Sequence, residues 1–235
     1  MLRKSISFFV LLSISILAFA QTKKQDIINN LNSKTSHYSE IAQELWLNPE
    51  LGYLEEKSAA LLQNELTKEG FKVEKGVAGI PTAFTATYGS GKPVIGVIGE
   101  FDALPGMSQS ATPTKNPRVD GAPGQACGHH LFGTGSMAAA IAVKDWLKAS
   151  GKSGTIRFYG TPAEEGGSGK VYMVREGLFN DVDAVLSWHP GDANQANPST
   201  NLATISGKFT FKGNSAHAAM APERGRSALD GVEAM

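Results

Sequence analysis

The sequence predicts an α/β fold, with a mostly parallel sheet flanked by helices, followed by the start of a second, α+β domain. Short apolar runs typical of buried parallel strands alternate with amphipathic helical stretches over most of the chain, which predicts the first domain. From residue 201 onward apolar and polar residues alternate as in a half-exposed strand, which predicts the second domain.

The first half of the predicted α/β domain contains two helices and three strands. Residues 24–46 and 55–68 carry apolar residues at intervals of three to four, the spacing of a helix with one buried face. Residues 71–74 and 82–88 have the composition of strands. The apolar run at 93–99 is short and nearly continuous, which favours a strand buried on both faces of a parallel sheet.

The second half of this domain repeats the alternation. A loop rich in proline and glycine at 105–124 precedes a long predicted helix at 131–148. A strand at 155–160, a helix at 169–177 and a further buried strand at 183–188 follow. Strands separated by helices favour parallel pairing, because a helix supplies the crossover between parallel neighbours.

The first twenty residues predict a secretory signal peptide. Arg3 and Lys4 precede an apolar run at 6–19, and the stretch ends in small residues around a cleavage site after Ala20. An uncleaved membrane anchor is the alternative, but the run is short and interrupted by serine. We therefore expect a secreted or periplasmic protein without stable membrane insertion.

Composition excludes some partners and sets the expected domain limits. The 235 residues include 22 basic and 22 acidic side chains, and the scattered basic residues offer no face for nucleic acid. The expected regions are a signal peptide at 1–20, a first domain at 21–200 and a second domain at 201–235. A helix predicted to begin near Ser227 has no stop signal before the chain ends, so we expect a C-terminally truncated fragment.

Unusual polar side chains follow three of the predicted buried strands. They are Glu100 and Asp102 after the first, Glu164 and Glu165 after the second, and His189 after the third. The carboxyl ends of parallel strands share one edge of a sheet, where ligands bind. Cys127 and His129 lie in the loop before the longest helix and can reach the same edge. Cysteine, histidine and glutamate together favour a borderline-soft divalent metal ion.

Each of these residues also has an ordinary explanation. Asp102 can cap a turn, Glu164 and Glu165 can complement a helix dipole, and Cys127 can be a small buried apolar residue. Cys127 is also a candidate nucleophile, because a thiol at a helix N-terminus near an imidazole has a lowered pKa. Cys127 and His129, two positions apart, converge more naturally on a common third atom. We therefore prefer the metal site and keep the cysteine-dependent hydrolase as an alternative.

The two adjacent glutamates suggest a division of labour. Neighbouring side chains at a strand end point in different directions, so Glu164 and Glu165 are not expected to do the same thing. One carboxylate can bind metal while the other serves as general base toward a metal-activated water. The reaction that this arrangement predicts is hydrolysis of an amide.

Five motifs resemble one known family. They are GEFDALPGMSQ, GQACGHHLFGTG, TPAEEGGSGKVYMVREGLF, DAVLSWHPGD and FKGNSAHAAMAPERGRSALD. They occur in the order seen in the dinuclear metallo-amidohydrolases of the aminoacylase and carboxypeptidase-G type, and the resemblance runs from about residue 44 to the end. It implies two divalent metal ions, zinc or manganese, and cleavage of an acyl-type amide bond to an amino acid such as glutamate.

The resemblance also implies a role for each matching residue. The implied metal ligands are Cys127, His129, Glu165 and His189. Glu164 matches the general base, and Asp102 matches a carboxylate that orients a ligand. His217 is similar to a histidine that stabilises the oxyanion in a partner subunit. Arg224 or Arg226 is a candidate for binding a substrate carboxylate, with a solvated loop charge as the equally good alternative.

Two features depart from the family pattern. His130 stands where the family usually has Asp or Asn, and an imidazole there can add a ligand, replace a hydrogen bond or crowd the site. Family members are roughly twice as long, and their last metal-binding histidine comes near the far end. The second domain matches the start of their lid and dimerisation domain, through which we expect a homodimer or hetero-oligomer. An inactive fragment that only binds is the remaining alternative.

Overall fold

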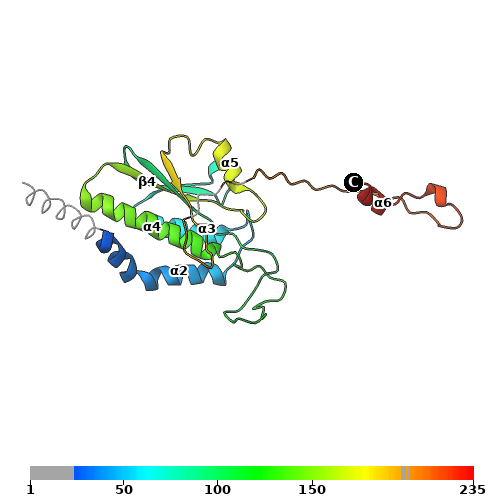
Figure 1. The fold of residues 1–235 in the computed structure, drawn as a ribbon, viewed down its shortest axis with the longest axis horizontal. Helices are drawn as coiled ribbons and strands as arrows, with labels where there is room; N and C mark the ends of the chain where they lie inside the picture. Colours follow the sequence, from blue (N-terminus) through cyan, green and yellow to red (C-terminus); the bar gives the residue numbers. More distant parts are fainter. Residues whose placement is uncertain (1–23, 197–199, 201) are drawn as a thin grey trace, which may run out of the picture. The chain divides into compact units, whose positions relative to one another are not determined.

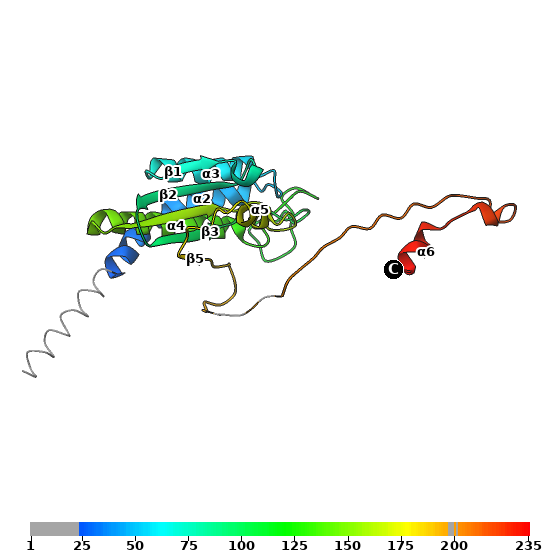
Figure 2. The same ribbon diagram turned by 90° about the horizontal axis from the view of Figure 1, so that it is seen from above.

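The computed structural model describes residues 24–196, 200 and 202–235 (Figures 1 and 2). The predicted signal peptide at 1–20 lies outside these residues. The chain divides into two compact units, the first ending at Asp192 and the second running from Ala193 to Met235. None of the helices in the described ranges combines the length and the apolar character needed to cross a membrane.

The first unit is built on a mixed sheet of five strands. The strands are β1 (Lys72–Lys75), β2 (Phe84–Ser90), β3 (Val94–Gly99), β4 (Gly154–Gly160) and β5 (Ala184–Leu186), in the order β1-β2-β4-β3-β5. β3 pairs in parallel with β4 and β5, whereas β1 pairs antiparallel with β2, and β2 antiparallel with β4. The prediction of a mostly parallel sheet was therefore wrong for β1 and β2. Their connections are too short to hold the crossover helix that parallel pairing requires.

The helices lie where the sequence predicts them, with shifted ends. They are α2 (Thr35–Leu47), α3 (Glu56–Lys68), α4 (His129–Ser150) and α5 (Gly169–Arg175) in the first unit, with a 3-10 turn η1 (Val77–Gly79). The helix predicted at 24–46 is divided by a turn at Lys34 into a helical stretch at 24–33 and α2. α3 and α4 pack on one face of the sheet, and α2 packs against α4 (Figure 1).

The core lies between the sheet and this helical layer. Leu62 and Leu66 of α3, Ile141 of α4, Phe84 of β2 and Phe158 of β4 are all essentially inaccessible to solvent. Burying each such side chain contributes about 1.5–3 kcal/mol. This packing holds β3 and β4 firmly side by side, so their carboxyl ends form a fixed base for the loops that follow them.

The second unit contains less regular structure than the sequence predicts. Residues 202–212 form no strand, although their apolar–polar alternation predicts one, and Leu202 and Ile205 are almost fully exposed. A strand needs a hydrogen-bonded neighbour, and the described part of this unit offers only a single bridge between Asn214 and Arg226. The predicted helix near Ser227 is confirmed as α6 (Ala228–Glu233), after a second 3-10 turn, η2 (Pro222–Arg224).

Candidate metal site

The ends of β3, β4 and β5 place four carboxylates and a histidine at one edge of the sheet. Glu100 and Asp102 follow β3 directly and are both buried. Glu164 and Glu165 lie in the loop after β4, and His189 lies three residues beyond β5. β3 is parallel to both of its neighbours, so these three strands end at the same edge, as the sequence predicts.

His129, the first residue of α4, lies at the centre of this cluster and is fully buried. Its Nδ1 atom is 2.9 Å from Oδ1 of Asp102, and its Nε2 atom is 2.8 Å from Oε2 of Glu100. Burial lowers the pKa of His129, but its hydrogen bonds to Asp102 and Glu100 outweigh burial and raise this pKa to about 10. Asp102 thus fixes Nδ1 as the donor and aims Nε2 at the cluster.

Cys127 and His189 approach His129 from the other side. Sγ of Cys127 is 3.4 Å from Nε2 of His189, whose Nδ1 donates to the carbonyl of Pro190. Gly128 allows this approach, because it has a left-handed backbone (φ 86°), and a Cβ there would lie 3.0 Å from the Pro190 side chain. The loop before α4 can therefore pack directly on the loop after β5.

The cluster offers two sets of ligand atoms that share His129. One set is Cys127, His129 and His189, and the other is Glu100, His129 and Glu164; within each set the ligand atoms lie within 4.8 Å of one another. These are the donor types that zinc and similar divalent ions prefer.

Three buried atoms of this cluster have no hydrogen-bond partner. They are Oε2 of Glu100, Nε2 of His129 and Oε1 of Glu165. The first two are close together but are not aligned for a hydrogen bond. Burying unpaired polar atoms is costly, so native proteins seldom leave them together without a ligand. The residues present therefore fit a divalent metal site.

The surroundings of Cys127 disfavour a thiolate nucleophile. Burial raises the pKa of this thiol to about 12, and a hydrogen bond to Glu165 and the charges of Glu164 and Glu100 act in the same direction. A catalytic cysteine needs the opposite shift, toward a thiolate at neutral pH. A metal ion supplies the positive charge that a thiolate at this position needs.

The structure brings Glu164 and Glu165 to the site in different environments. Glu164 is partly exposed, with Oε2 3.8 Å from Nε2 of His129, and burial together with the charge of Glu100 raises its pKa. The backbone N–H of Glu165 donates to Oδ2 of Asp102, and its side chain reaches toward Cys127. Glu164, and not Glu165, belongs to a set of converging ligand atoms, so the predicted assignment of ligand and base stays a prediction.

Glu100 is the site residue to which the sequence analysis assigned no role. Its Oε2 atom faces His129, and its Oε1 atom pairs with Lys170 of α5. Its pKa is lowered, because the hydrogen bonds from His129 and Lys170 outweigh the opposing effect of burial. The available signal was its place directly after β3, two residues before Asp102.

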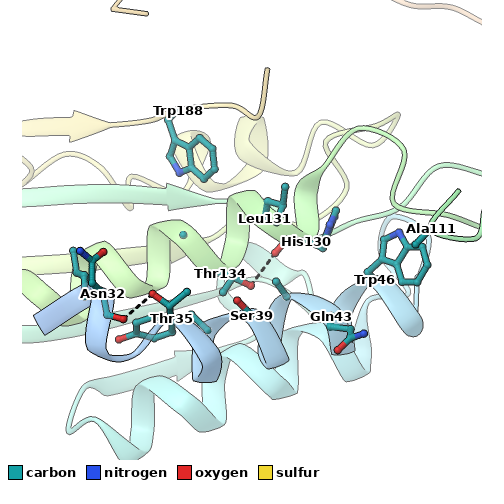
Figure 3. A pocket seen from close by; sticks show the side chains of 14 residues that line it. Asn32, Thr35, Ser39, Gln43, Trp46, Ala111, His130, Leu131, Thr134 and Trp188 are labelled. Atoms are coloured by element: carbon teal, nitrogen blue, oxygen red, sulfur yellow. Dashed lines mark hydrogen bonds between the residues drawn. The ribbon is translucent and has the colours of Figure 1, made fainter. Parts of the chain in front are cut away.

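The side chain of His130 belongs to neither set of converging ligand atoms. It lines a cavity of about 790 Å³ between α2 and α4, together with Trp46 and Trp188 (Figure 3). Its backbone N–H donates to Gln125, while its Nδ1 atom is buried without a partner. Burial, and secondarily the charge of His129, lowers its pKa.

The remaining predicted residues lie in the second unit. Nδ1 of His217 accepts hydrogen bonds from the backbone N–H groups of Ala219 and Met220, as a loop cap does. Arg224 pairs with the neighbouring Glu223, and the backbone of Arg226 pairs with that of Asn214. The roles predicted for His217, Arg224 and Arg226 stay predictions.

Fold and site together define a metal-binding α/β domain, and comparison with known proteins identifies its family. The profile of the peptidase family M20/M25/M40 matches residues 96–225. The chain is 50% identical to a p-aminobenzoyl-glutamate hydrolase polypeptide of Escherichia coli over 207 residues, which is 87% of this chain and 43% of that protein. The chain therefore belongs to the M20 peptidase family, and it spans less than half the length of this relative.

Solved structures agree with this assignment. A dinuclear metal-binding M20 peptidase from Bacillus subtilis is 25% identical, with a TM-score of 0.59 over 68% of this chain and 44% of that one. An aminobenzoyl-glutamate utilization protein from Klebsiella pneumoniae has a TM-score of 0.56 at 20% identity, over 86% of this chain and 56% of that one. The latter likeness shows the fold alone.

Proposed function

We propose that the protein is a metal-dependent amidohydrolase that cleaves an acyl-type amide bond to an amino acid. The observation that carries this proposal is the group of unpaired buried atoms on Glu100, His129 and Glu165, which surround the partly exposed Glu164. The name of the Escherichia coli relative supports an aminobenzoyl-glutamate-like substrate or another N-acyl amino acid.

The residues fit two divalent ions, for which we propose zinc or manganese. Cys127, His129, Glu165 and His189 would hold them, and the position of Glu100 makes it a further candidate ligand. When bound, such ions polarise an amide carbonyl and make water a stronger acid.

The side chains of this chain then divide the remaining work. Asp102 holds His129 in one tautomer by accepting from its Nδ1. Glu164, which is exposed enough to meet a substrate, takes a proton from the attacking water and passes it to the leaving amine. Its raised pKa suits a group that must both accept and release a proton near neutral pH.

We propose further roles for the second unit and for the first twenty residues. His217 would stabilise the oxyanion of the reaction, and Arg224 or Arg226 would bind the carboxylate of the amino acid product. The second unit would begin a lid through which subunits associate. The protein would be secreted or periplasmic after cleavage at Ala20.

The test is hydrolysis of p-aminobenzoyl-glutamate and of a panel of N-acyl amino acids, measured before and after removal of metal by a chelator. We expect activity to disappear with the chelator and to return with zinc or manganese, and to survive a thiol-blocking reagent added to the metal-loaded protein. Activity that survives chelation but not thiol blocking would establish the cysteine-dependent alternative instead. An intact fold with neither metal nor activity would establish a binding protein.

A further inference from the structure

The loop that carries Glu164 and Glu165 has an unusual backbone. Ala163 and Ser168 both adopt left-handed conformations, with φ angles of 56° and 55°. Residues with a Cβ atom seldom do so, and such a conformation persists only where the surrounding structure holds it. Ala163 directly precedes Glu164, so the orientation of its peptide decides where both glutamate side chains point.

Glu55, located just before α3, is the group that holds Ala163. Its side chain is fully buried, and its Oε1 atom accepts a hydrogen bond of 2.8 Å from the backbone N–H of Ala163. Its Oε2 atom accepts one of 2.9 Å from the hydroxyl of Thr82. Both carboxylate oxygens are thus used, and one of them is spent on the loop of the candidate site.

The turn that contains Glu55 contacts the same loop at two further points. The hydroxyl of Tyr53, a residue that is itself left-handed (φ 66°), donates to the carbonyl of Gly167. Gly52 lies so close that a Cβ there would come within 3.0 Å of Ala163. The whole turn therefore forms a support for the loop, and Glu55 provides its buried polar contact.

Asp102 holds the other side of Glu164. Its Oδ2 atom accepts a hydrogen bond of 2.9 Å from the backbone N–H of Glu165, while its Oδ1 atom binds His129. The N–H groups of residues 163 and 165 are therefore each bound by a buried carboxylate, one from the turn before α3 and one from the end of β3. Glu164 lies between these two fixed peptides.

We propose that Glu55 is a positioning residue, which fixes the peptide of Ala163 and thereby aims Glu164 and Glu165 at the metal site. The inference rests on the proposed function, because it assumes that these two glutamates serve the reaction. Glu55 touches neither substrate nor metal in this proposal. It acts only through the backbone of the loop.

A purely structural role is the competing explanation. The carbonyl of Glu55 also accepts the first hydrogen bond of α3, from the N–H of Ala59. A substitution that only weakened the start of α3 would lower stability without moving Glu164. The test therefore needs a readout at the loop itself, as well as a control that removes a buried glutamate elsewhere on α3.

Three single variants provide this contrast. Glu55→Met removes the acceptor, whereas Glu55→Gln keeps an oxygen for the N–H of Ala163 and turns its amide toward the hydroxyl of Thr82. Glu65→Met is the matched control, because Glu65 is also a buried glutamate of this segment but contacts His37 and Lys68. Should Glu55→Met fail to fold, combining it with Ala163→Gly removes the strain at residue 163, and this double variant takes its place.

The first readout is amide hydrogen exchange at Ala163 and Glu165 in the metal-free protein. We expect Glu55→Met to remove protection at Ala163 and to reduce it at Glu165, while Glu55→Gln and Glu65→Met preserve both. The second readout is steady-state kinetics, in which Glu55→Met should lower kcat by about 10- to 100-fold with KM nearly unchanged. Glu55→Gln should stay within about threefold of the wild type.

Unchanged protection at Ala163 in a folded Glu55→Met protein would overturn the proposal, as would equal losses in Glu65→Met. Lowered stability with unchanged kcat would also overturn it, because that result describes a structural residue. Failure of the proposed function has a different signature. The wild type would then hydrolyse no amide, while the exchange measurement would still decide whether Glu55 holds the loop.

Discussion

The two ends of α4 use the same types of charged side chain in opposite ways. At its N-terminal end, His129 lies among Glu100, Asp102 and Glu164, and buried ligand atoms stay unpaired. At its other end, Lys144 pairs with Glu69 at 2.6 Å and with Asp145 at 2.7 Å, and Lys34 adds a further contact to Asp145 at 3.4 Å. We call these two regions the metal-site cluster and the Lys144 network.

The difference separates a binding site from a structural one. In the Lys144 network each charge faces an opposite charge, and no atom of it is among the unpaired buried polar atoms of the described residues. Such a network joins α2, α3 and α4 and needs nothing added. The metal-site cluster has an excess of carboxylates and atoms without partners, so a cation would complete it.

The largest effect is expected at Glu164. The substitution Glu164→Ala should lower kcat by about 10²- to 10⁴-fold, because it removes the general base, while the metal content stays unchanged. Turnover and metal content are measured on the same sample. Glu165→Ala is the paired variant and should lose metal; if Glu164→Ala loses metal instead, the two glutamates have exchanged roles.

A smaller effect is expected at Asp102, which supports the cluster without belonging to either set of converging ligand atoms. Asp102→Asn leaves one oxygen for the two donors that Asp102 now serves, His129 and the N–H of Glu165. We expect metal affinity to fall about 10- to 100-fold, measured by competition with a chromophoric chelator. Asp181→Asn is the control, because Asp181 pairs with Arg157 beyond the amino-terminal end of β5, and it should leave the affinity unchanged.

The Lys144 network should affect stability alone. Lys144→Met removes the cation shared by Glu69 and Asp145, and we expect the free energy of unfolding to fall by about 1–3 kcal/mol in urea titrations. Metal affinity should not change. A loss of metal binding in a folded Lys144→Met protein would show that the two ends of α4 are coupled and would contradict the contrast drawn here.

The smallest effect concerns the pH dependence of the same network. Burial raises the pKa of Asp145, but the hydrogen bond and charge of Lys144 outweigh burial, so this pKa is lowered in the folded protein. The resulting stabilisation is complete above the pKa of an unfolded aspartate, about 3.9, and is lost as the pH falls through the lower folded value. The stability difference between the wild type and Lys144→Met should therefore shrink below about pH 4. An unchanged difference would mean that Asp145 does not contribute.

The convergence of the site could be predicted from the sequence because it follows from strand order alone. Polar residues after three buried runs must meet if the runs are parallel, and β3, β4 and β5 are. The direction of β2 could not be predicted this way, because apolar spacing is the same in parallel and antiparallel strands. The strand expected at 202–212 was wrong because alternation gives a strand its two faces but no partner.

The supporting contacts were beyond the reach of sequence patterns for a different reason. Glu55 and Ala163 are 108 residues apart, and neither has a motif that links it to the other. Glu100 was visible as a strand-end carboxylate, but only the distance of its Oε2 atom from His129 gives it a place in the metal-site cluster. Long-range hydrogen bonds to backbone atoms carry no residue-type signal, so they emerge only from the folded structure.

The most direct test of the central claim is a calorimetric titration of zinc or manganese into chelator-treated protein. We predict binding of up to two ions, with heat that is lost in Cys127→Ser and His129→Ala, and a rise in the unfolding temperature of the wild type, because a ligand that binds only the folded state stabilises it. Absence of binding, or binding that both variants retain in full, would contradict the assignment of the metal-site cluster.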